Sequence, residues 1–293
     1  MAKNSANVKL AATVILYHPS DDDLANISTY LDDVDHLYII DNTEGKNNKD
    51  RLPISEKIDY VWKNENLGIA KALNLAAKKA QKAGFKWLLT NDQDTTFPKG
   101  ILPALKKRIA STDTSNIAIV TPWHKTKLHN RRPRHNPDFP HDVMTSGNLL
   151  NLDIWEKLGG FKEWLFIDSV DLEYCLNLRQ HGYKILRDNS LEIEHNLGDL
   201  FYKKIYHFNF LCTNHPPIRR YYMMRNAHYL LDMYRDTKEC SYVMQLGAAQ
   251  KRNMIGVLLF ERQKIAKIRM YLLGYRDYQQ GIKGKFIPKK ERK

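Results

Sequence analysis

The first ninety residues alternate between short apolar runs and amphipathic segments, and this alternation restricts the fold more than any other feature. Short, apolar, β-branched runs predict strands at 8–17, 36–41, 58–62 and 85–90. Helical spacing of apolar residues predicts helices from Ser20 to Leu31 and from Gly68 to about Ala83. Such alternation predicts an α/β fold, in which helices flank a mostly parallel sheet on both faces.

The rest of the chain has weaker signals. The stretch 122–142 has four prolines and four histidines and predicts a long loop. Residues 143–152 predict a pair of strands around Gly147. Helices are expected at 169–181, 219–234 and 246–275.

Three side chains stand at predicted carboxyl ends of strands: Tyr17, Asp41 and Asp92. In a parallel sheet, ligands bind outside these strand ends. We therefore expect a nucleotide site at this edge.

An acidic pair, Asp92 and Asp94, follows the fourth predicted strand. Two carboxylates one residue apart can share Mg²⁺ or Mn²⁺, which prefer oxygen ligands and complete their shells with phosphate and water. Such an ion would neutralise a diphosphate leaving group. Acidic pairs also occur by chance in loops, so this motif needs its context.

The charge is unevenly distributed and suggests a boundary between 1–200 and 201–293. The later region holds 20 of the 46 Lys and Arg but only 6 of the 33 acidic residues. A basic region attracts anionic lipid, pyrophosphate-lipid substrates or nucleic acid, although it can also be a solvated helical surface. We expect 201–293 to be a mainly helical C-terminal extension.

Cysteines and hydropathy bear on the compartment. Cys175, Cys212 and Cys240 are widely spaced and odd in number, which fits neither a disulfide framework nor a zinc site and favours a reducing cytosol. The first apolar run, 10–17, is too short to cross a bilayer. We expect a cytoplasmic protein without a membrane-spanning helix.

An ordered set of motifs carries a resemblance to a known family. The set comprises IIDN (39–42), NENLGIAKALN (64–74), LLTNDQD (88–94), TSGNLL (145–150), GGF (159–161), LFIDSVDLEYCL (165–176), HNLGD (195–199) and RRYYMMRN (219–226). Over roughly residues 8–230 the chain resembles family 2 of the inverting glycosyltransferases, which have the GT-A fold. DQD, HNLG and RYY..RN resemble its bacterial rhamnosyltransferase branch.

The resemblance implies roles on the donor side. Asp41 would contact the base or ribose of a nucleotide-diphosphate sugar. Tyr17, Asn66 and Gly68 would face the same nucleotide.

It also implies a metal site. Asp92 would hold the ribose or reach the metal through water, and Asp94 would coordinate Mn²⁺ or Mg²⁺ directly. His195 matches a late histidine that completes the metal and diphosphate site in some relatives, and it could otherwise be a surface histidine.

Asp171 matches the catalytic base of the family. The family usually has a Glu-Asp pair at this position, but here the preceding residue is Val170, and Asp168 could supply a second carboxylate. Glu173 matches a later acidic position. A base accepts the proton of the attacking hydroxyl as the sugar bond breaks. The alternative is that Asp171 only caps the following helix.

Four residues are candidates for the sugar and acceptor: Gly147, Asn148, Trp164 and Asp168. Gly147 would let backbone approach the sugar closely. A plain hairpin turn and a core tryptophan are the alternatives at these positions.

We therefore expect metal-dependent, inverting sugar transfer to a hydroxyl of a cell-surface glycan, with L-rhamnose from dTDP-rhamnose as the first donor and a UDP-linked galactofuranose, galactose or glucose as the alternative. A nucleotidyltransferase, a nucleotide-sugar hydrolase and a nucleic-acid-binding protein remain rivals. Tyr221, Tyr222, Tyr229 and Tyr234 recur with Arg225, His228 and Arg235, a mixture suited to the inner face of a membrane near a lipid-linked acceptor. A homodimer remains open.

Overall fold

The chain folds into two units with separate hydrophobic cores. The computed structural model describes residues 8–126, 131–194, 201–205 and 208–288. Unit 1 comprises Met1–Phe161 and Tyr174–Asn196, and unit 2 comprises Lys162–Glu173 and Leu197–Lys293. The segment Lys162–Glu173 therefore belongs with the C-terminal residues, although it lies within the 1–200 region that charge alone delimits.

A seven-stranded sheet forms the centre of unit 1, with the order β3-β2-β1-β4-β6-β5-β7. Its strands are β1 (Leu10–Leu16), β2 (His36–Asp41), β3 (Ile58–Trp62), β4 (Trp87–Asp92), β5 (Ile117–Lys125), β6 (Asn148–Asn151) and β7 (Lys184–Glu194). Only β6 runs antiparallel to its neighbours among these strands. The expected mostly parallel α/β sheet is confirmed.

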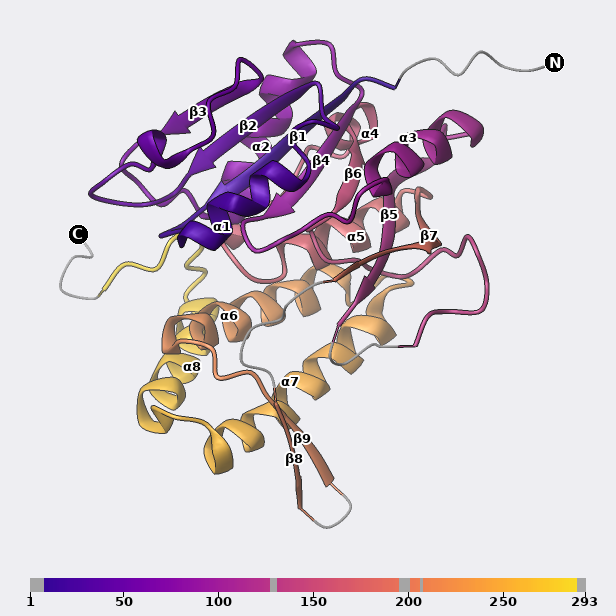
Figure 1. Ribbon diagram of the computed structural model, residues 1–293. Helices are drawn as coiled ribbons and strands as arrows, with labels where there is room; N and C mark the ends of the chain where they lie inside the picture. The colour runs from indigo at the N-terminus through magenta and orange to yellow at the C-terminus, as the bar shows by residue number, and fades with distance from the viewer. Residues whose placement is uncertain (1–7, 127–130, 195–200, 206–207, 289–293) are drawn as a thin grey trace. The chain divides into compact units, whose positions relative to one another are not determined.

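Helices flank this sheet (Figure 1). They are α1 (Asp21–Asn26), α2 (Gly68–Lys82), α3 (Ile101–Ser111), α4 (Leu152–Lys157) and α5 (Val170–Gln180), which continues from unit 2 into unit 1. Ser20 caps α1 as its sequence predicts: its side chain accepts from the Asp23 N–H. Side chains of α1 and α3 pack with alternate residues of β1 in one buried cluster.

Unit 2 contains three long helices and a hairpin. The helices are α6 (Pro217–Tyr234), α7 (Cys240–Phe260) and α8 (Lys264–Gln279), and the hairpin is formed by β8 (Phe201–Ile205) and β9 (Phe208–Cys212). Gly274 of α8 lies against α6 so closely that a Cβ there would come within 2.4 Å of the Tyr221 carbonyl oxygen. The two helices therefore pack through bare backbone at this point.

The structure corrects three expectations. Residues 122–125 continue β5 and are not loop. The stretch 143–152 contributes the single strand β6, and Leu152 already opens α4. The expected helix 246–275 breaks between α7 and α8, where Gln263 has a left-handed φ of 54°.

Candidate active site

Three neighbouring strands bring the predicted donor residues to one edge of the unit 1 sheet. The register pairs Leu16 of β1 with Asp41 of β2, and Ile15 of β1 with Asp92 of β4. Tyr17 follows β1 directly and is 48% exposed. Strand β6 is antiparallel, so its first residue, Asn148, lies at the same edge, opposite Thr90. We call this edge the donor edge.

Asp41 organises the loop that follows β2. Its Oδ1 accepts from the Thr43 N–H at 2.9 Å, and its Oδ2 accepts from the Asn48 amide at 2.9 Å and the Tyr60 hydroxyl at 2.5 Å. Burial raises the pKa of the Asp41 carboxyl, but hydrogen bonds from Tyr60, Thr43 and Asn48 outweigh this effect and hold it below its usual value. Asp41 is therefore a buried anion, only 2% exposed, that fixes the loop beside the donor edge.

A second loop is tied to the first. The Asn42 side chain accepts from the Leu67 N–H and donates to the Gly68 carbonyl, each at 3.2 Å. Asn66 accepts from the Gly68 N–H at 2.9 Å, which closes a tight turn at the start of α2. Gly68 has a φ of 76° that glycine adopts without strain. Asn66 and Gly68 thus adjoin the Asp41 loop, as the sequence predicts.

The acidic turn after β4 is held from both sides. The Gln93 side-chain Oε1 accepts from the Tyr17 N–H at 2.8 Å. The Gln93 backbone carbonyl accepts from the Asn26 side-chain amide at 3.0 Å. The Asp92 N–H donates to Ser146 Oγ at 3.2 Å. These bonds fix the backbone between Asp92 and Asp94, while the Gln93 side chain points back to β1. The residue between the two aspartates therefore links the turn to Tyr17.

Residues 145–148 pack directly on the end of β4. The Gly147 N–H donates to the Thr90 carbonyl at 2.8 Å, and its φ is 76°. This φ favours glycine, and a Cβ at Gly147 would also come within 2.4 Å of Ile193 Cδ1, which would have to move. The Asn148 amide donates to the Met144 carbonyl at 2.6 Å. Gly147 and Asn148 therefore lie beside Asp92 at the donor edge.

The donor edge suits a divalent cation by its chemistry. Asp92 and Asp94 offer carboxylate oxygens from one short turn, and Asp94 is exposed. Hard cations such as Mg²⁺ take few protein carboxylates and complete their shell with phosphate and water, so two carboxylates fit such a site. Within the described ranges, no three His, Cys, Asp or Glu side chains cluster as a metal site. His195 lies outside the described residues.

In unit 2, the backbone before α5 is strained. Phe166, Asp168 and Ser169 have positive φ values of 68°, 63° and 63°. The Ile167 N–H donates to the Leu165 carbonyl at 2.9 Å, so Phe166 forms the centre of a rare γ-turn. Non-glycine residues in such conformations cost about 1–3 kcal/mol each and persist only when the surroundings hold them. We call residues 164–169 the strained loop.

Helix α6 holds the strained loop through the side chains of Arg225 and Asn226. The Asn226 amide donates to the carbonyls of Leu165, Ile167 and Asp168 at 3.1, 2.9 and 2.9 Å. The fully buried Arg225 donates to the Trp164 and Leu165 carbonyls at 3.3 and 3.1 Å. The Arg225 Nε also donates to Asn226 Oδ1 at 3.0 Å, which orients the amide. The Arg-Asn end of the RRYYMMRN motif therefore shapes this loop.

Asp168 belongs to the same arrangement. Its carboxylate accepts two hydrogen bonds from Arg219 in a bidentate pair, with Nε at 2.7 Å. Burial raises the pKa of Asp168, while the Arg219 guanidinium acts in the opposite direction. Trp164 lies edge-on to Tyr229 at 5.2 Å, and Lys283 Nζ lies 4.7 Å from its ring. Trp164 and Asp168, two of the four predicted sugar and acceptor residues, thus lie in unit 2.

Asp171 lies in the first turn of α5, directly after the strained loop. Its Oδ1 accepts from the Leu172 N–H at 2.8 Å. Two residues later, Glu173 is fully buried; the Tyr234 hydroxyl donates to its Oε1 at 3.2 Å. Burial raises the pKa of Glu173 to about 7, against smaller opposing effects of Lys162 and Tyr234. A second carboxyl therefore adjoins Asp171, but it faces the interior of unit 2.

The comparisons with known proteins agree with this geometry. Residues 32–174 match the model of glycosyl transferase family 2, and so span both the Asp41 loop and Asp171. This match gives residues 32–174 the character of a glycosyltransferase domain similar to family 2. The chain is 26% identical over 245 residues to the dTDP-rhamnosyl transferase RfbF of Shigella flexneri, covering 77% of this chain and 80% of that protein.

Solved structures share the fold of this glycosyltransferase. GalNAc-T7 with UDP, GalNAc and Mn²⁺ matches with a TM-score of 0.59 and 10% identity, over 94% of this chain and 57% of that one. S. aureus TarS matches with a TM-score of 0.51 and 14% identity, over 96% of this chain and 50% of that one. The chain thus spans 57% of the length of the first structure and 50% of the second. The expected GT-A fold is confirmed.

The glycosyltransferase therefore has two groups of predicted residues. Unit 1 brings Tyr17, Asp41, Asn66, Gly68, Asp92, Asp94, Gly147 and Asn148 to or beside the donor edge, and unit 2 holds Trp164, Asp168 and Asp171. Sequence reasoning assigned no roles to the linking residues Asn42, Gln93, Ser146 and Asn226, although each lies inside a motif that it singled out.

One interpretation is wrong. Tyr221, Tyr222 and Tyr234 are at most 3% exposed, and Arg225 is fully buried. These four residues of the tyrosine and arginine series are therefore core of unit 2, whereas His228 and Tyr229 are partly buried and Arg235 is exposed. No helix within the described ranges is both long and apolar enough to cross a membrane.

Proposed function

We propose that the glycosyltransferase transfers L-rhamnose from dTDP-rhamnose, with inversion, to a hydroxyl of a cell-surface polysaccharide or other glycan acceptor. The observation that carries the proposal is the donor edge, where three adjacent strand ends place Tyr17, the Asp41 loop and the acidic turn side by side. The similarity to RfbF over most of both chains supports rhamnose as the sugar.

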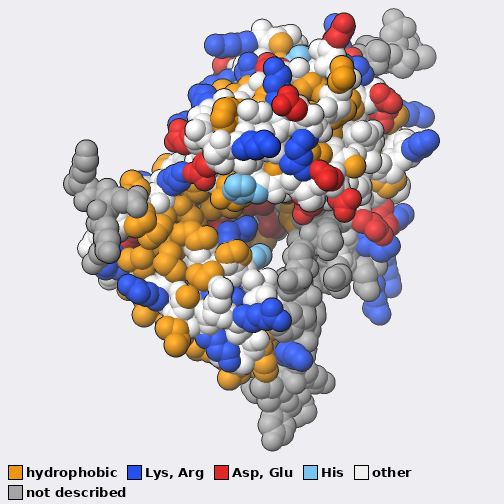
Figure 2. Space-filling view, turned by 60° about the vertical axis from the view of Figure 1, so that its left-hand side comes forward, with side chains coloured by type: hydrophobic (Ala, Val, Ile, Leu, Met, Phe, Trp, Pro, Cys, Tyr) orange, Lys and Arg blue, Asp and Glu red, His pale blue; other side chains and the backbone are white. Residues whose placement is uncertain are grey.

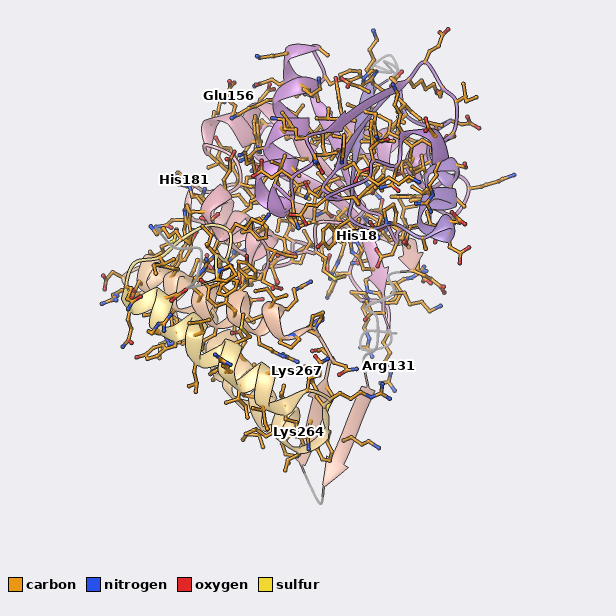
Figure 3. All side chains as sticks on the ribbon, turned by 90° about the vertical axis from the view of Figure 1, so that its left-hand side faces the viewer. His18, Arg131, Glu156, His181, Lys264 and Lys267 are labelled. Atoms are coloured by element: carbon orange, nitrogen blue, oxygen red, sulfur yellow. The ribbon has the colours of Figure 1, made fainter. Side chains whose placement is uncertain are left out.

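On the donor side, Tyr17 and the Asn66 turn bind the nucleotide. Tyr17 presents an exposed ring next to its neighbour His18, labelled in Figure 3, whose N–H donates to Thr43 Oγ1 at 2.9 Å. The Asp41 carboxylate is already taken by protein donors, so it acts on the base or ribose by ordering the loop that contacts them.

A divalent cation, Mn²⁺ or Mg²⁺, is held by Asp94 with Asp92 beside it. When bound, it neutralises charge on the diphosphate leaving group. Asp92 also reaches the ribose, and His195 is a further proposed ligand. The backbone bonds from Gln93 and Ser146 keep the two carboxylates on one fixed turn.

Asp171 is the proposed catalytic base. As the acceptor oxygen attacks the anomeric carbon, the Asp171 carboxylate takes the hydroxyl proton, and the bond from that carbon to the diphosphate oxygen breaks. The electron pair leaves with the nucleoside diphosphate, and a single displacement inverts the anomeric centre. The strained loop, fixed by Arg225 and Asn226, sets where α5 begins and so positions Asp171.

The sugar and acceptor are proposed to contact Gly147, Asn148, Trp164 and Asp168. At Gly147, the absent side chain leaves backbone available to the sugar. A UDP-linked sugar is the alternative donor. We place the enzyme in the cytoplasm, with its acceptor at the inner face of an anionic membrane that the basic C-terminal region binds; a homodimer stays a proposal.

A donor panel tests this proposal. In the presence of Mn²⁺, dTDP-rhamnose should raise the Tm of the protein more than UDP-sugars do, because a ligand that binds only the folded state raises Tm. Product analysis should then show transfer to glycan and not hydrolysis. A larger rise in Tm with a UDP-sugar would show that the donor is that UDP-sugar and not dTDP-rhamnose. Hydrolysis of the nucleotide sugar without transfer would contradict the proposal that the site is a transferase site.

Two variants test the roles. Asp94→Ala should abolish metal-dependent turnover, while Asp171→Asn should leave donor binding near normal and lower transfer by roughly a thousandfold. Asp153→Asn is a matched control, because Asp153 also lies in the first turn of a helix, α4, where it makes the same contribution to the helix dipole. If Asp171→Asn transfers sugar at the parent rate, Asp171 is not the catalytic base and only contributes to the start of α5.

A further inference from the structure

The turn between α7 and α8 exposes an unusual number of apolar side chains. Ile255, Leu258 and Leu259 near the end of α7 are 48%, 45% and 47% exposed, and Ile265 at the start of α8 is 84% exposed. The first three lie three and four residues apart, so they share one face of the helix. We call residues 255–265 the α7–α8 corner. Large apolar side chains gathered on a surface mark a site of interaction.

Basic side chains surround this corner. Arg252, Arg262, Lys264 and Arg269 are exposed. Between residues 240 and 288 the chain has nine Lys and Arg but only two acidic residues, Glu261 and Asp277, which are 3% and 0% exposed. Figure 2 shows hydrophobic and basic side chains next to one another on the visible face of the C-terminal helices. The corner therefore combines apolar and positive surface without exposed negative charge.

The corner is also held rigidly. The Glu261 carboxylate accepts from Arg220 at 2.8 and 2.9 Å, from Lys267 at 2.8 Å and from the Thr213 N–H at 2.9 Å. Hydrogen bonds from Lys267 and Thr213 and the charge of Arg220 keep the pKa of Glu261 below its usual value despite burial. We call these contacts the Glu261 cluster. It lies where α7 ends and α8 begins, and it leaves Ile265 exposed on the surface.

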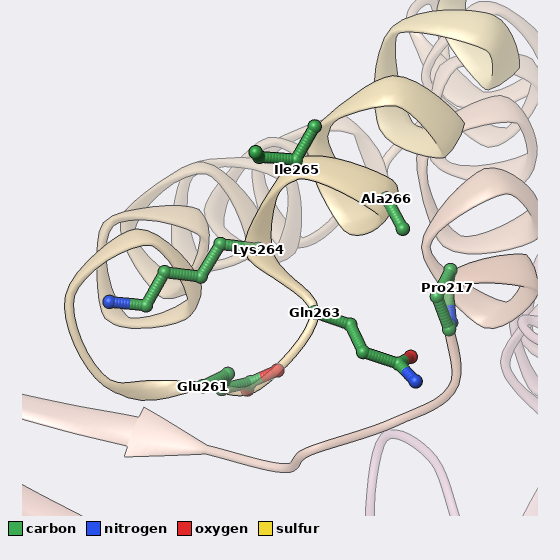
Figure 4. Close-up of a pocket in the computed structure, with 6 residues that line it drawn as sticks. All are labelled: Pro217, Glu261, Gln263, Lys264, Ile265 and Ala266. Carbon is green, nitrogen blue, oxygen red and sulfur yellow. The ribbon is translucent and has the colours of Figure 1, made fainter.

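An open pocket of 780 Å³ lies beside the Glu261 cluster (Figure 4). It is lined by Pro217, Glu261, Gln263, Lys264, Ile265 and Ala266. Figure 4 shows Ile265 and Lys264 directed away from the Glu261 carboxylate. Lys264 and the buried Lys267 are also labelled in Figure 3. Lys264 is exposed and its Nζ donates to the Leu259 carbonyl at 2.9 Å, whereas the buried Lys267 donates to the Glu261 carboxylate.

We propose that the α7–α8 corner docks on the surface of an anionic lipid bilayer, with Leu258, Leu259 and Ile265 entering the headgroup region and Arg252, Arg262 and Lys264 facing lipid phosphates. This pattern of apolar centre and basic rim is how interfacial helices bind anionic membranes. It replaces α6 as the membrane-binding element and does not depend on the reaction that the enzyme catalyses.

Charge distinguishes this occupant from two others. A symmetric dimer through the corner would place the same basic residues opposite one another without an acidic partner, which opposes association. A nucleic acid would gain little from exposed Ile and Leu, because single strands are held by stacking on aromatic rings. An anionic bilayer satisfies both the apolar and the basic side chains.

Vesicle co-sedimentation of the full chain, without any sugar donor, tests the proposal. The parent should bind phosphatidylcholine vesicles that contain phosphatidylglycerol and bind pure phosphatidylcholine far less. Arg262→Gln with Lys264→Gln should weaken binding at low salt by about fivefold per charge and approach the parent at high salt. Leu258→Gln with Leu259→Gln should weaken binding roughly tenfold at both salt concentrations.

Matched controls remove equal charge and apolar surface elsewhere. Lys78→Gln with Lys107→Gln, both exposed on unit 1 helices, and Ile54→Gln, which is fully exposed, should bind as the parent does. Circular dichroism checks that each variant is folded. Equal losses in the control variants, equal binding to neutral vesicles, or a dimer that dissociates in the leucine variant without any vesicle binding would each overturn the proposal.

Discussion

The donor edge in unit 1 and the strained loop in unit 2 are built in opposite ways. At the donor edge, Asp41 ends strand β2 and is held by Thr43, Asn48 and Tyr60, all within nineteen residues. The strained loop depends on Asn226, about sixty residues away in the chain. Local bonding fixes the Asp41 loop of the donor edge, whereas a distant helix fixes the loop that precedes Asp171.

The electrostatics differ in the same sense. Asp41 has donors on both oxygens and a lowered pKa, so it stays ionised. Glu173 has one buried oxygen, Oε2, that accepts no hydrogen bond among the described residues, and its pKa is raised. One region is thus organised around a permanent anion, and the other encloses a carboxyl that is neutral below about pH 7.

Of the variants that test this difference between the two regions, Asn226→Ala should have the largest effect on catalysis. It removes the donor to three carbonyl oxygens of the strained loop, so kcat should fall by roughly 10- to 100-fold as Asp171 loses its position. The free energy of unfolding should fall by about 1–3 kcal/mol. The donor KM should stay near the parent value, because the donor edge is bonded within unit 1. Steady-state kinetics and urea denaturation measure these changes.

The control for Asn226 is Asn177→Ala, which removes a buried amide with one bond, to the Leu158 carbonyl at 3.4 Å. It should cost stability with little change in kcat. If Asn226→Ala loses stability yet keeps the parent kcat, then the loop does not position the base.

Asp41→Asn tests the other side of the comparison. The variant keeps the shape but replaces the charged acceptor of Tyr60, so stability should fall by about 1.5–3 kcal/mol and the donor KM should rise roughly tenfold, with kcat little changed. Since its folded pKa lies below the ordinary value of 3.8, the carboxylate of the parent stabilises above that pH and loses its effect as pH falls through the range below it. Denaturation at pH 7 and at pH 3 should thus show a smaller difference in the variant.

Asp59→Asn serves as the control for Asp41, because Asp59 is a half-exposed partner of Lys79 on β3. It should change neither the donor KM nor the acid dependence by a comparable amount. An unchanged KM in Asp41→Asn would exclude the Asp41 loop from donor binding.

The smallest expected effect is a change in the shape of the stability curve. The raised pKa of Glu173 gives stability that is fully present below the ordinary value of 4.5 and is lost as pH rises through about 7. Glu173→Gln should flatten the curve between these values and leave the variant relatively more stable at pH 8. Glu156→Gln, at an exposed position labelled in Figure 3, is the control. Equal pH dependence in parent and Glu173→Gln would show that Glu173 ionises normally.

Much of the donor edge could be predicted because its signals are local. Strands β2 and β3 begin and end where apolar runs do, and the capping pattern at Ser20 marks α1 correctly. The parallel register then brings Asp41 and Asp92 to the same edge without further information. The role of Gln93 could not be read, because its bond to the Tyr17 N–H depends on how two loops meet.

Unit 2 is harder to predict from the sequence, because charged residues that usually lie on the surface are buried there. The types of Arg225 and Lys267 predict surface positions, yet both are buried; Arg225 donates to the Leu165 carbonyl and Lys267 to Asn214 Oδ1, each more than fifty residues away. The break between α7 and α8 has no proline or glycine to mark it. It follows from the pairing of Glu261 with Arg220, which hydropathy and propensity do not record.

The interleaving of Lys162–Glu173 with the C-terminal helices has a practical consequence for protein engineering. A chimaera that exchanges everything after residue 196 would pair a foreign α6 with the resident loop, and the carbonyls that Arg225 and Asn226 serve would meet unrelated side chains. Grafting a new C-terminal region therefore requires moving residues 162–173 with it, as a second, non-contiguous insert.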